Sequence, residues 1–348
     1  MRNALVSIII PAFNAAADIR PALNSVRAQT YQEIEVIVVD DGSSDATSTI
    51  VEEFARRDAR FQLVRQANEG VGAARNAGIR KARGKYIATL DADDLWFPEK
   101  LEKQVACIQQ WGDDTGLVYC WSTLTDKDGK LVDDGSTGTF EGRLRHVLVL
   151  LNVLGNASVP LFRAAVLEKV GLYLTRAEQA GAQGCEDWDL ALRVAELFNV
   201  RVVPEYLVAY RQNGSSMSVN TGSMAASYAV TMHRARQRNS DLPSAAFRWS
   251  AGYFYLYLAD KCHACGRYSD CLGFLEEAVR ANPVLLLKAG IYKRSIKAAL
   301  RTLTGSAVKT KRAAQFHSNK RKRRSSVLNL PFRYFELARW SAALHDGA

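Results

Sequence analysis

Short apolar runs alternate with helix-like segments over the first hundred residues. The runs that predict buried strands are 6–10, 35–39, 61–64 and 86–90. The segments between them have helical spacing or a Gly/Ala-rich composition and predict helices at 15–29, 44–54 and 68–83. Strands that alternate with helices are typical of βαβ units. We therefore predict an α/β domain with a mostly parallel sheet.

The pattern changes further along the chain. Residues 115–215 are mixed, with a short strand at 200–203 that Pro204 is expected to end and a polar, turn-rich loop at 209–218. The remainder shows only helical spacing, and residues 249–283 resemble one tetratricopeptide helix pair. We predict an α/β domain over 1–220, a helical region over 221–283 and a basic amphipathic region over 284–348.

Charge is distributed unevenly. The 348 residues carry a formal net charge of +10, yet residues 281–335 alone hold fourteen Lys and Arg and no acid. The rest of the chain therefore sums to −4, and the basic character belongs to the C-terminal region. Six scattered cysteines, an opening without signal-peptide features and the absence of an apolar run long enough to cross a bilayer favour a cytoplasmic protein.

Polar residues directly follow three of the predicted strands. These residues are Pro11 to Asn14, Asp40 to Ser43, and Asp91 to Asp94. In sheets of this kind the carboxyl ends of the strands form a crevice in which ligands bind. The sequence therefore predicts a binding site where the three groups meet.

Asp91-Ala-Asp93-Asp94 is the first of two acidic clusters. Two carboxylates in a D-x-D turn can hold a hard divalent cation and leave positions open for phosphate oxygens. A solvated acidic turn ahead of the helix that starts near Pro98 explains the same residues. Taken alone, D-x-D is therefore a weak motif.

Asp40-Asp41-Gly42-Ser-Ser-Asp45 is the second cluster. Its carboxylates can accept hydrogen bonds from a base or a ribose, and Gly42 allows a sharp turn. A strand-to-helix turn capped by Ser44 is the alternative. The nearby Gly70-Val-Gly72 segment is not a dinucleotide fingerprint, because its sixth position is Arg75 and it does not close the first βα unit.

Five motifs occur together and in a fixed order. They are Ser7-Ile-Ile-Ile-Pro-Ala-Phe-Asn14, Val39-Asp-Asp-Gly-Ser-Ser-Asp45, Asn68-Glu-Gly-Val-Gly-Ala-Ala-Arg-Asn-Ala-Gly78, Leu90-Asp-Ala-Asp-Asp94 and Glu186-Asp-Trp-Asp-Leu190. Together they resemble the family 2 inverting glycosyltransferases with the GT-A fold, over roughly residues 5–218. The resemblance implies transfer of a sugar from a nucleotide-diphosphate sugar, such as a UDP-sugar, to an acceptor hydroxyl with Mn²⁺ or Mg²⁺.

The resemblance also implies roles for residues that would bind the nucleoside of the donor. Pro11, Phe13 and Asn14 would form the rim around the base, with Phe13 against its ring. Asp41 would accept a hydrogen bond from the base, and Asp40 would support the ribose side.

Five further residues would complete the donor and metal sites. Arg75 would face the base or the diphosphate, and Asn68 and Arg211 would belong to the same donor site. Asp91 would contact the ribose or the sugar and lie beside the metal, whereas Asp93 would be the direct metal ligand.

Asp187 would be the general base that deprotonates the acceptor hydroxyl, with Glu186 as its supporting neighbour. The chemistry agrees, because sugar transfer passes through an oxocarbenium-like state and a single displacement needs one base. The pair is also explained as the acidic first turn of a helix over 189–197, which the helix dipole favours. The structural and catalytic interpretations are compatible.

Two departures from the family pattern bear on function. Many relatives have a His near Tyr210-Arg211 that can complete the metal shell, whereas the nearest candidate here is Asn213. Processive relatives carry Gln-x-x-Arg-Trp soon after the base, but Ala245 stands in the Gln position before the distant Arg248-Trp249. We therefore predict that a single sugar is added.

Cysteine spacing gives a weaker candidate site. Cys262-His-Ala-Cys265 could be half of a zinc site, but only Cys271 follows it. We interpret these cysteines as packing residues of a helix.

The C-terminal region predicts a basic amphipathic helix over 284–303, followed by a basic cluster at 320–324. The expected basic face holds Lys293, Arg294, Lys297 and Arg301, and the expected apolar side holds Ile291, Ile296, Leu300 and Leu303. Such a segment favours an anionic membrane surface, and lipid-linked or carbohydrate acceptors in the family agree with the inner face of the cell membrane. A helix packed on the core is the alternative. Nucleic acid is not an expected partner, because the segment lacks interleaved aromatic residues.

Two other functions compete with sugar transfer. A nucleotidyltransferase also uses a nucleotide-binding α/β domain, but it would place a Gly-rich phosphate loop where Pro11 to Asn14 stand. A basic RNA-binding protein would instead retain RNA through its tail in a salt-dependent way.

Overall fold

The computed structural model describes residues 4–126, 131–211 and 219–303. Its internal contacts divide the chain into two compact units. The first unit comprises the residues up to 148 together with 152–241, and the second comprises 149–151 together with the residues from 242 onward.

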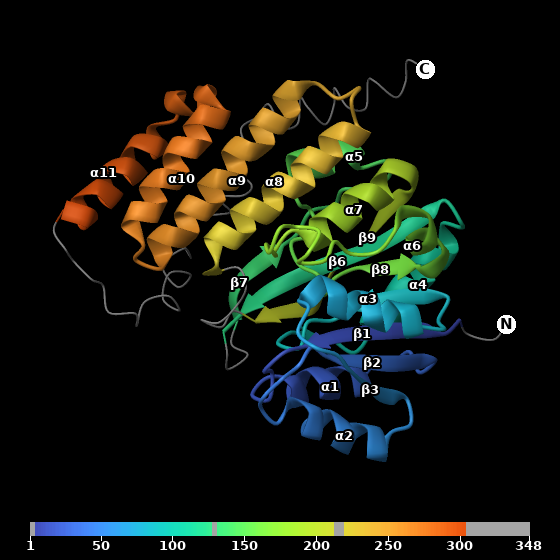
Figure 1. Ribbon diagram of the computed structural model, residues 1–348. Coiled ribbons are helices and arrows are strands. Elements are labelled where there is room, and N and C mark those ends of the chain that lie inside the picture. Colours follow the sequence, from blue (N-terminus) through green and yellow to red (C-terminus); the bar gives the residue numbers. More distant parts are fainter. Residues whose placement is uncertain (1–3, 127–130, 212–218, 304–348) are drawn as a thin grey trace. The chain divides into compact units, whose positions relative to one another are not determined.

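The described residues of the first unit form a nine-stranded sheet (Figure 1). The strands are β1 (Val6–Ala12), β2 (Ile34–Asp40), β3 (Phe61–Arg65), β4 (Tyr86–Thr89), β5 (Leu95–Trp96), β6 (Thr115–Thr125), β7 (Leu131–Ser136), β8 (Leu161–Arg163) and β9 (Asn199–Arg211). Their order across the sheet is β3-β2-β1-β4-β8-β6-β9-β5, and β7 pairs with β6.

The first four strands, β3, β2, β1 and β4, are parallel, which confirms the α/β fold class that the sequence predicts. β8 and β5 run antiparallel to their neighbours, while β6 and β9 are parallel to each other. The chain passes from β1 to β3 in one direction and then returns past β1 to β4. Because crossover connections are right-handed, this reversal opens a crevice between the carboxyl ends of β1 and β4.

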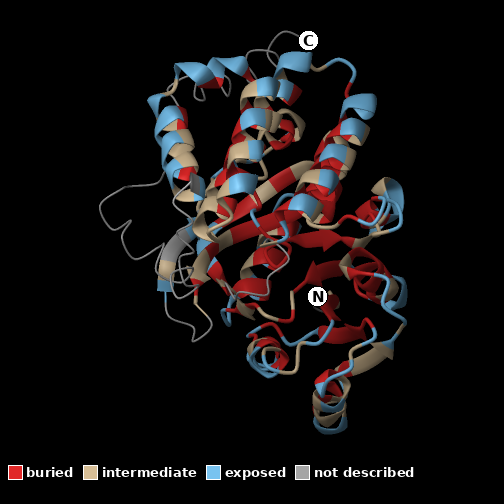
Figure 2. Cartoon of the chain, turned by 60° about the vertical axis from the view of Figure 1, so that its left-hand side comes forward, coloured by how far each residue is buried: buried red, intermediate tan, exposed pale blue. Residues whose placement is uncertain are grey.

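Helices cover the sheet of the first unit. They are α1 (Ile19–Arg27), α2 (Thr47–Arg57), α3 (Val71–Lys81), α4 (Lys100–Gln110), α5 (Arg145–Leu150), α6 (Ala164–Val170), α7 (Glu186–Leu197) and α8 (Thr221–Arg238). β1 and β2 are buried along their whole length (Figure 2). Full burial of each Ile or Val side chain contributes about 1.5–3 kcal/mol, so these strands give the loops at their ends a rigid base.

α3 packs closely because its inner face is made of small residues. A Cβ on Gly78 would lie 2.5 Å from Cγ2 of Ile9, and a Cβ on Gly72 would lie 2.2 Å from the carbonyl oxygen of Leu174. Asn76 Nδ2 donates to the carbonyl of Tyr173 (2.8 Å), and the amide of Tyr173 donates back to Asn76 Oδ1 (2.9 Å). The segment at 173–174 is thereby held against α3.

β9 continues through Pro204, so the prediction that this proline ends the strand is wrong. Val203 pairs with Cys120 and Tyr206 pairs with Trp121, which leaves the two residues between them as a bulge. A bulge tolerates proline because it does not require the missing N–H. β9 also includes the first three residues of the loop predicted at 209–218, and the rest of that loop lies outside the described residues.

α8 packs on α7 within the first unit. The rings of Trp188 and Tyr228 lie 5.6 Å apart, and the amide of Cys185, just before α7, donates to Ser227 Oγ (2.9 Å). The boundary predicted at residue 220 lies between β9 and α8, inside this unit.

The second unit is helical. Its elements are α9 (Ser244–Ala264), α10 (Tyr268–Ala281), the 3₁₀ helix η2 (Pro283–Leu287) and α11 (Ala289–Leu303). α9 and α10 occupy the segment that resembles a helix pair, and Cys262 and Cys271 are buried between apolar side chains there. No helix in the described part of either unit is both long and apolar enough to span a membrane.

The continuous helix predicted over 284–303 is in fact two elements separated by Lys288. The backbone of Lys288 is extended, with φ −96° and ψ 114°. Its ammonium group bonds the hydroxyl of Tyr253 and lies 4.5 Å from the centroid of the same ring. The break therefore allows a charged side chain to reach an aromatic partner.

Candidate active site

The loops that follow β1 and β2 are joined through Asn14. Its amide donates to Ser43 Oγ (2.9 Å), and its Oδ1 accepts from the amide of Ser44 (2.9 Å). Asn14 has a φ of 48°, a left-handed conformation that asparagine tolerates better than most residues. Phe13 beside it is 52% exposed, whereas Pro11 is buried within β1. Of the predicted base rim, only Phe13 and Asn14 are therefore at the surface.

The carboxylate of Asp40 is buried and holds its own turn. Oδ1 accepts from the amide of Ser43 (2.9 Å), and Oδ2 accepts from the hydroxyl of Ser48. The predicted contact of Asp40 with the ribose side stays a prediction, since both of its oxygens already have partners.

Asp41 organises the loop that precedes α3. Its Oδ1 accepts from Gln66 Nε2 (2.7 Å) and the amide of Glu69 (2.9 Å), and its Oδ2 accepts from the amide of Gly70 (2.9 Å). Asn68 Nδ2 donates to the carbonyl of Asp41 (3.0 Å). Asp41 and Asn68 are thus brought together as predicted site neighbours, but their contacts in this structure are to the loop itself.

Arg75 projects from α3 into the interior and is 1% exposed. Its Nη2 lies 2.6 Å from Asp91 Oδ1 and its Nη1 lies 2.8 Å from Glu186 Oε1. The guanidinium also lies 5.1 Å from the ring centroid of Tyr173. The sequence places Arg75 toward the donor, whereas the structure places it between two carboxylates from separate parts of the chain.

The two carboxylates keep Arg75 charged. Burial lowers the pKa of Arg75, but the charges of Asp91 and Glu186 outweigh burial and raise that pKa above its ordinary value. Its Nε–H has no hydrogen-bond partner among the described residues. The charge is therefore compensated by ion pairs rather than by a complete set of hydrogen bonds.

The acidic turn after β4 holds more negative charge than its surroundings compensate. Burial, together with the charge of Asp91, raises the pKa of Asp93 to about 6. Burial and the charges of Asp93 and Asp91 raise the pKa of Asp94 well above its usual range. Asp94 is fully buried, and its oxygens accept from Ser158 Oγ (2.6 Å) and from the amide of Arg211 (3.0 Å). It therefore ties the acidic turn to the end of β9.

Arg211 closes the opposite side of this turn. Its Nε donates to the carbonyl of Asp93, and its Nη2 donates to the carbonyl of Asp18 (3.0 Å). Arg211 is 5% exposed. The structure therefore brings it to the predicted metal turn, where it holds backbone groups in place.

Glu186 and Asp187 begin α7 and face different partners. Glu186 accepts from Arg75 and, through Oε2, from the amide of Gly184 (2.8 Å). Asp187 Oδ1 accepts from the amide of Trp188 (2.7 Å). Burial of its carboxyl group, together with the charge of Glu186, raises the pKa of Asp187 to about 7. A carboxylate with this pKa can exchange a proton near neutral pH.

Asp91 and Asp93 fit a hard divalent cation. They offer two carboxylates one residue apart at a strand end, and the raised pKa of Asp93 reflects negative charge that such a cation would offset. No group of three or more His, Cys, Asp or Glu in the described parts of the chain could hold a metal. The remaining ligands would then be diphosphate oxygens and water. The position of Asn213 lies outside the described residues.

Three contributors to this site escaped the sequence analysis as site residues. Tyr173 lies under the guanidinium of Arg75, and Ser158 bonds both Asp94 and the amide of Asp91 (3.0 Å). Neither belongs to a motif that gave a signal. Asp94 did have one, because it is the third acid of the D-x-D-D sequence and directly follows the predicted metal ligand.

The chain is similar to known glycosyltransferases. The family model described as Glycosyl transferase family 2 matches residues 7–126. EpsH of Bacillus subtilis, named as a glycosyltransferase, is 36% identical over 173 residues, and the match spans 48% of this chain and about half (49%) of EpsH. The glycosyltransferase alr2836 of Nostoc sp. is 32% identical over 225 residues, which are 63% of this chain and 68% of that protein.

Solved structures agree in fold. TarS 1-349 of S. aureus superposes with a TM-score of 0.55 at 19% identity, covering 86% of this chain and 90% of that one. The mannosyltransferase PcManGT of Pyrobaculum calidifontis, in complex with GDP-Man and Mn²⁺, gives a TM-score of 0.53 at 19% identity and covers 86% and 87%. At these identities the likeness shows the fold alone.

The double ion pair of Arg75 predicts a pH-dependent loss of stability. Arg75→Gln leaves the carboxylate of Glu186 buried without a cation, which typically costs about 3–5 kcal/mol. The unpaired carboxylates would have raised pKa values in the folded state, so the loss should be largest at pH 8 and smaller at pH 5, where they can be protonated. Urea unfolding at both pH values measures this difference.

Arg80→Gln is the matched control, because Arg80 is an exposed arginine on the same helix. It should change the unfolding free energy by less than about 0.5 kcal/mol. Equal urea midpoints for the two variants at both pH values would show that the buried pairs do not support the fold.

Proposed function

The chain belongs to glycosyltransferase family 2, and from this we propose that it is a metal-dependent inverting enzyme that transfers a single hexosyl group. The donor would be a UDP-sugar or another nucleotide-diphosphate sugar, and the acceptor would present a hydroxyl. The observation that supports this most directly is Arg75, which joins Asp91 at the strand-end crevice to Glu186 beside the proposed base. One buried cation thus links the donor side of the site to the acceptor side.

On the acceptor side, we propose Asp187 as the general base. Its pKa of about 7 leaves a substantial fraction deprotonated at neutral pH while giving the carboxylate more basicity than an ordinary aspartate. Arg75 and the amide of Gly184 bind the neighbouring Glu186, which remains turned toward them. Asp187 is then the member of the pair that can meet an acceptor hydroxyl.

On the donor side, we propose that Asp93 and Asp91 hold Mn²⁺ or Mg²⁺. When bound, the ion would neutralise charge on the departing diphosphate. Phe13, the exposed aromatic residue at the end of β1, would stack on the nucleotide base. TarS in complex with UDP-GlcNAc and PcManGT in complex with GDP-Man support a nucleotide-sugar donor for this fold.

We further propose that the second unit attaches the protein to the inner face of the cell membrane, where a lipid-linked or polysaccharide acceptor would be reached. Tyr292, Ile296 and Leu300 are spaced one helical turn apart on α11 and are 51%, 60% and 57% exposed. Leu287 in η2 is 86% exposed. Ile291 is buried instead, so the apolar side predicted from sequence is divided between the core and an exposed stripe.

Basic residues accompany this exposed stripe. Lys293 and Lys297 each follow a member of the stripe, and α11 contains no acid. Apolar side chains flanked by lysines suit an anionic lipid surface, which accepts both. The basic cluster at 320–324 lies outside the described residues.

Asp187→Asn tests the assignment of the base. Asparagine keeps the shape of the side chain but cannot accept a proton, so turnover should fall by about 10²–10⁴ while donor binding persists. Glu186→Gln should lower turnover less, because Glu186 acts through its neighbours. Single-turnover rates and nucleotide-sugar affinity measure the two effects separately. An inactive Gln variant beside an active Asn variant would reverse the assignment.

Asp93→Ala tests the donor and metal site without relying on turnover. The variant should lose the Mn²⁺-dependent part of its affinity for UDP by calorimetry while its far-UV circular dichroism stays unchanged. Glu168→Ala, which removes an exposed acid from α6, is the control and should bind UDP like the wild type. If Asp93→Ala retains its Mn²⁺-dependent affinity, the metal is held elsewhere.

Ile296→Ser combined with Leu300→Ser tests the membrane surface. Burial of each apolar side chain in lipid is worth about 1.5 kcal/mol or more, so the double variant should sediment with anionic vesicles at least about 10-fold more weakly. Binding of the wild type should fall steeply with salt. Tyr257→Ser removes an exposed aromatic residue from α9 and should have little effect. Equal binding of the wild type to neutral and anionic vesicles would contradict the proposal.

A further inference from the structure

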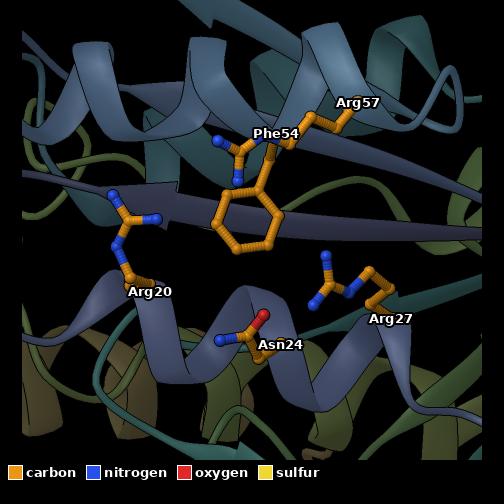
Figure 3. A pocket seen from close by; sticks show the side chains of 5 residues that line it. All are labelled: Arg20, Asn24, Arg27, Phe54 and Arg57. Carbon is orange, nitrogen blue, oxygen red and sulfur yellow. The ribbon is translucent and has the colours of Figure 1, made fainter.

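A small basic pocket lies between α1 and α2, on residues that take no part in the proposed active site. It has a volume of about 220 Å³ and is lined by Arg20, Asn24, Arg27, Phe54 and Arg57. Arg20, Asn24 and Arg27 are spaced four and three residues apart, so they share one face of α1. Figure 3 shows the three guanidinium groups arranged around the ring of Phe54.

Phe54 orients two of these arginines. Its ring is 6% exposed, and the guanidinium carbons of Arg20 and Arg27 lie 5.9 and 5.6 Å from its centroid. Contact with an aromatic face restricts a long arginine side chain that would otherwise move freely. Two of the guanidinium groups are therefore held in place before any ligand arrives, which lowers the entropic cost of binding one.

The acids near the pocket are already bound by arginines other than Arg27 and Arg57. Glu53 pairs with Arg20 (2.7 Å), Glu52 pairs with Arg65, and Asp58 pairs with Arg60 (2.7 Å). Neither Arg27 nor Arg57 forms an ion pair with any residue that the structure describes. The pocket thus holds two guanidinium groups without counter-charges.

The surroundings are basic in a part of the chain that is otherwise acidic. α1 together with residues 47–65 contains six arginines and three acids, a local charge of +3. The chain outside residues 281–335 carries −4 in total. A local concentration of arginine of this kind creates a positive potential that attracts anions.

We propose that this pocket binds a phosphate group. Arg27 and Arg57 would supply the charge, Arg20 would add donors beside its bond to Glu53, and the amide of Asn24 would donate as well. Guanidinium groups match the geometry of phosphate oxygens, and a dianion suits two uncompensated cations better than a single carboxylate does. The volume is below the roughly 300–1,000 Å³ of pockets for drug-sized ligands, so it fits a phosphate group rather than a whole nucleotide sugar.

The phosphate could belong to a soluble molecule or to a lipid headgroup, and this site is independent of the proposed sugar transfer. The test uses inorganic phosphate with the full chain, in chloride buffer of matched ionic strength and with excess UDP and Mg²⁺ present. Phosphate should raise the Tm of the wild type, because a ligand that binds the folded state stabilises it. In the variant carrying both Arg27→Gln and Arg57→Gln, the affinity for phosphate should be at least about 10-fold weaker.

Two further variants make the result specific. Arg56→Gln removes an exposed arginine beside the pocket from the same helix and should retain phosphate binding within about 3-fold, because its charge is screened. Replacing Arg27 and Arg57 with lysine keeps both charges but removes the forked donors, and its affinity should be intermediate. The affected arginines are exposed, so all variants should fold and transfer sugar like the wild type.

Vesicles of phosphatidic acid in phosphatidylcholine separate the two sources of phosphate. Retention of the wild type that is reduced in the Arg27→Gln, Arg57→Gln variant but not in Arg56→Gln assigns a lipid headgroup. Binding of inorganic phosphate that follows the same pattern, without a vesicle effect, assigns a soluble phosphate. Equal losses in the pocket variant and in Arg56→Gln, or no loss in the pocket variant with either probe, overturn the proposal.

Discussion

A guanidinium that is almost completely buried needs carboxylates within reach, and Arg75 obtains them from two parts of the chain. Asp91 follows the central strand β4, and Glu186 begins α7. Gly72 and Asn76 allow α3 to approach the segment at 173–174 closely enough for Arg75 to lie under Tyr173. The positions of α3, the acidic turn and the start of α7 therefore depend on one another. The geometry of the proposed active site follows from that dependence.

The electrostatics of the crevice follow from the same arrangement. Arg75 compensates Asp91 and Glu186, but the adjacent Asp93 and Asp187 remain in an environment that raises their pKa values. One of these carboxylates lies at the strand end, where a cation would offset its charge, and the other lies where a proton acceptor is useful. A single arginine thus leaves two neighbouring carboxylates with different chemistry, as enzymes with paired acids commonly require.

Much of this fold could be predicted from the sequence, because buried parallel strands are nearly continuous apolar runs and their ends are marked by polar motifs. The sequence located the crevice and the family for the same reason. It could not show that Arg75 turns inward, because an arginine in a Gly/Ala-rich helix gives no sign of its partners. Pro204 was misinterpreted because the bulge that tolerates it is a property of its pairing with β6. The uncompensated charge of Arg27 and Arg57 likewise depends on which arginines bind the nearby acids.

The pH dependence of sugar transfer in the wild-type protein tests the central claim most directly, namely that Arg75, Glu186 and Asp187 form one electrostatic unit. Single-turnover rates would be measured from pH 5 to 9 with donor and Mn²⁺ saturating, so that Asp93 is already engaged. A base is active when deprotonated, so the rate should rise with pH through a midpoint near 7, the pKa of Asp187, and then level off. A rate that is constant over this range, as for a carboxylate with an ordinary pKa near 4, would contradict the account.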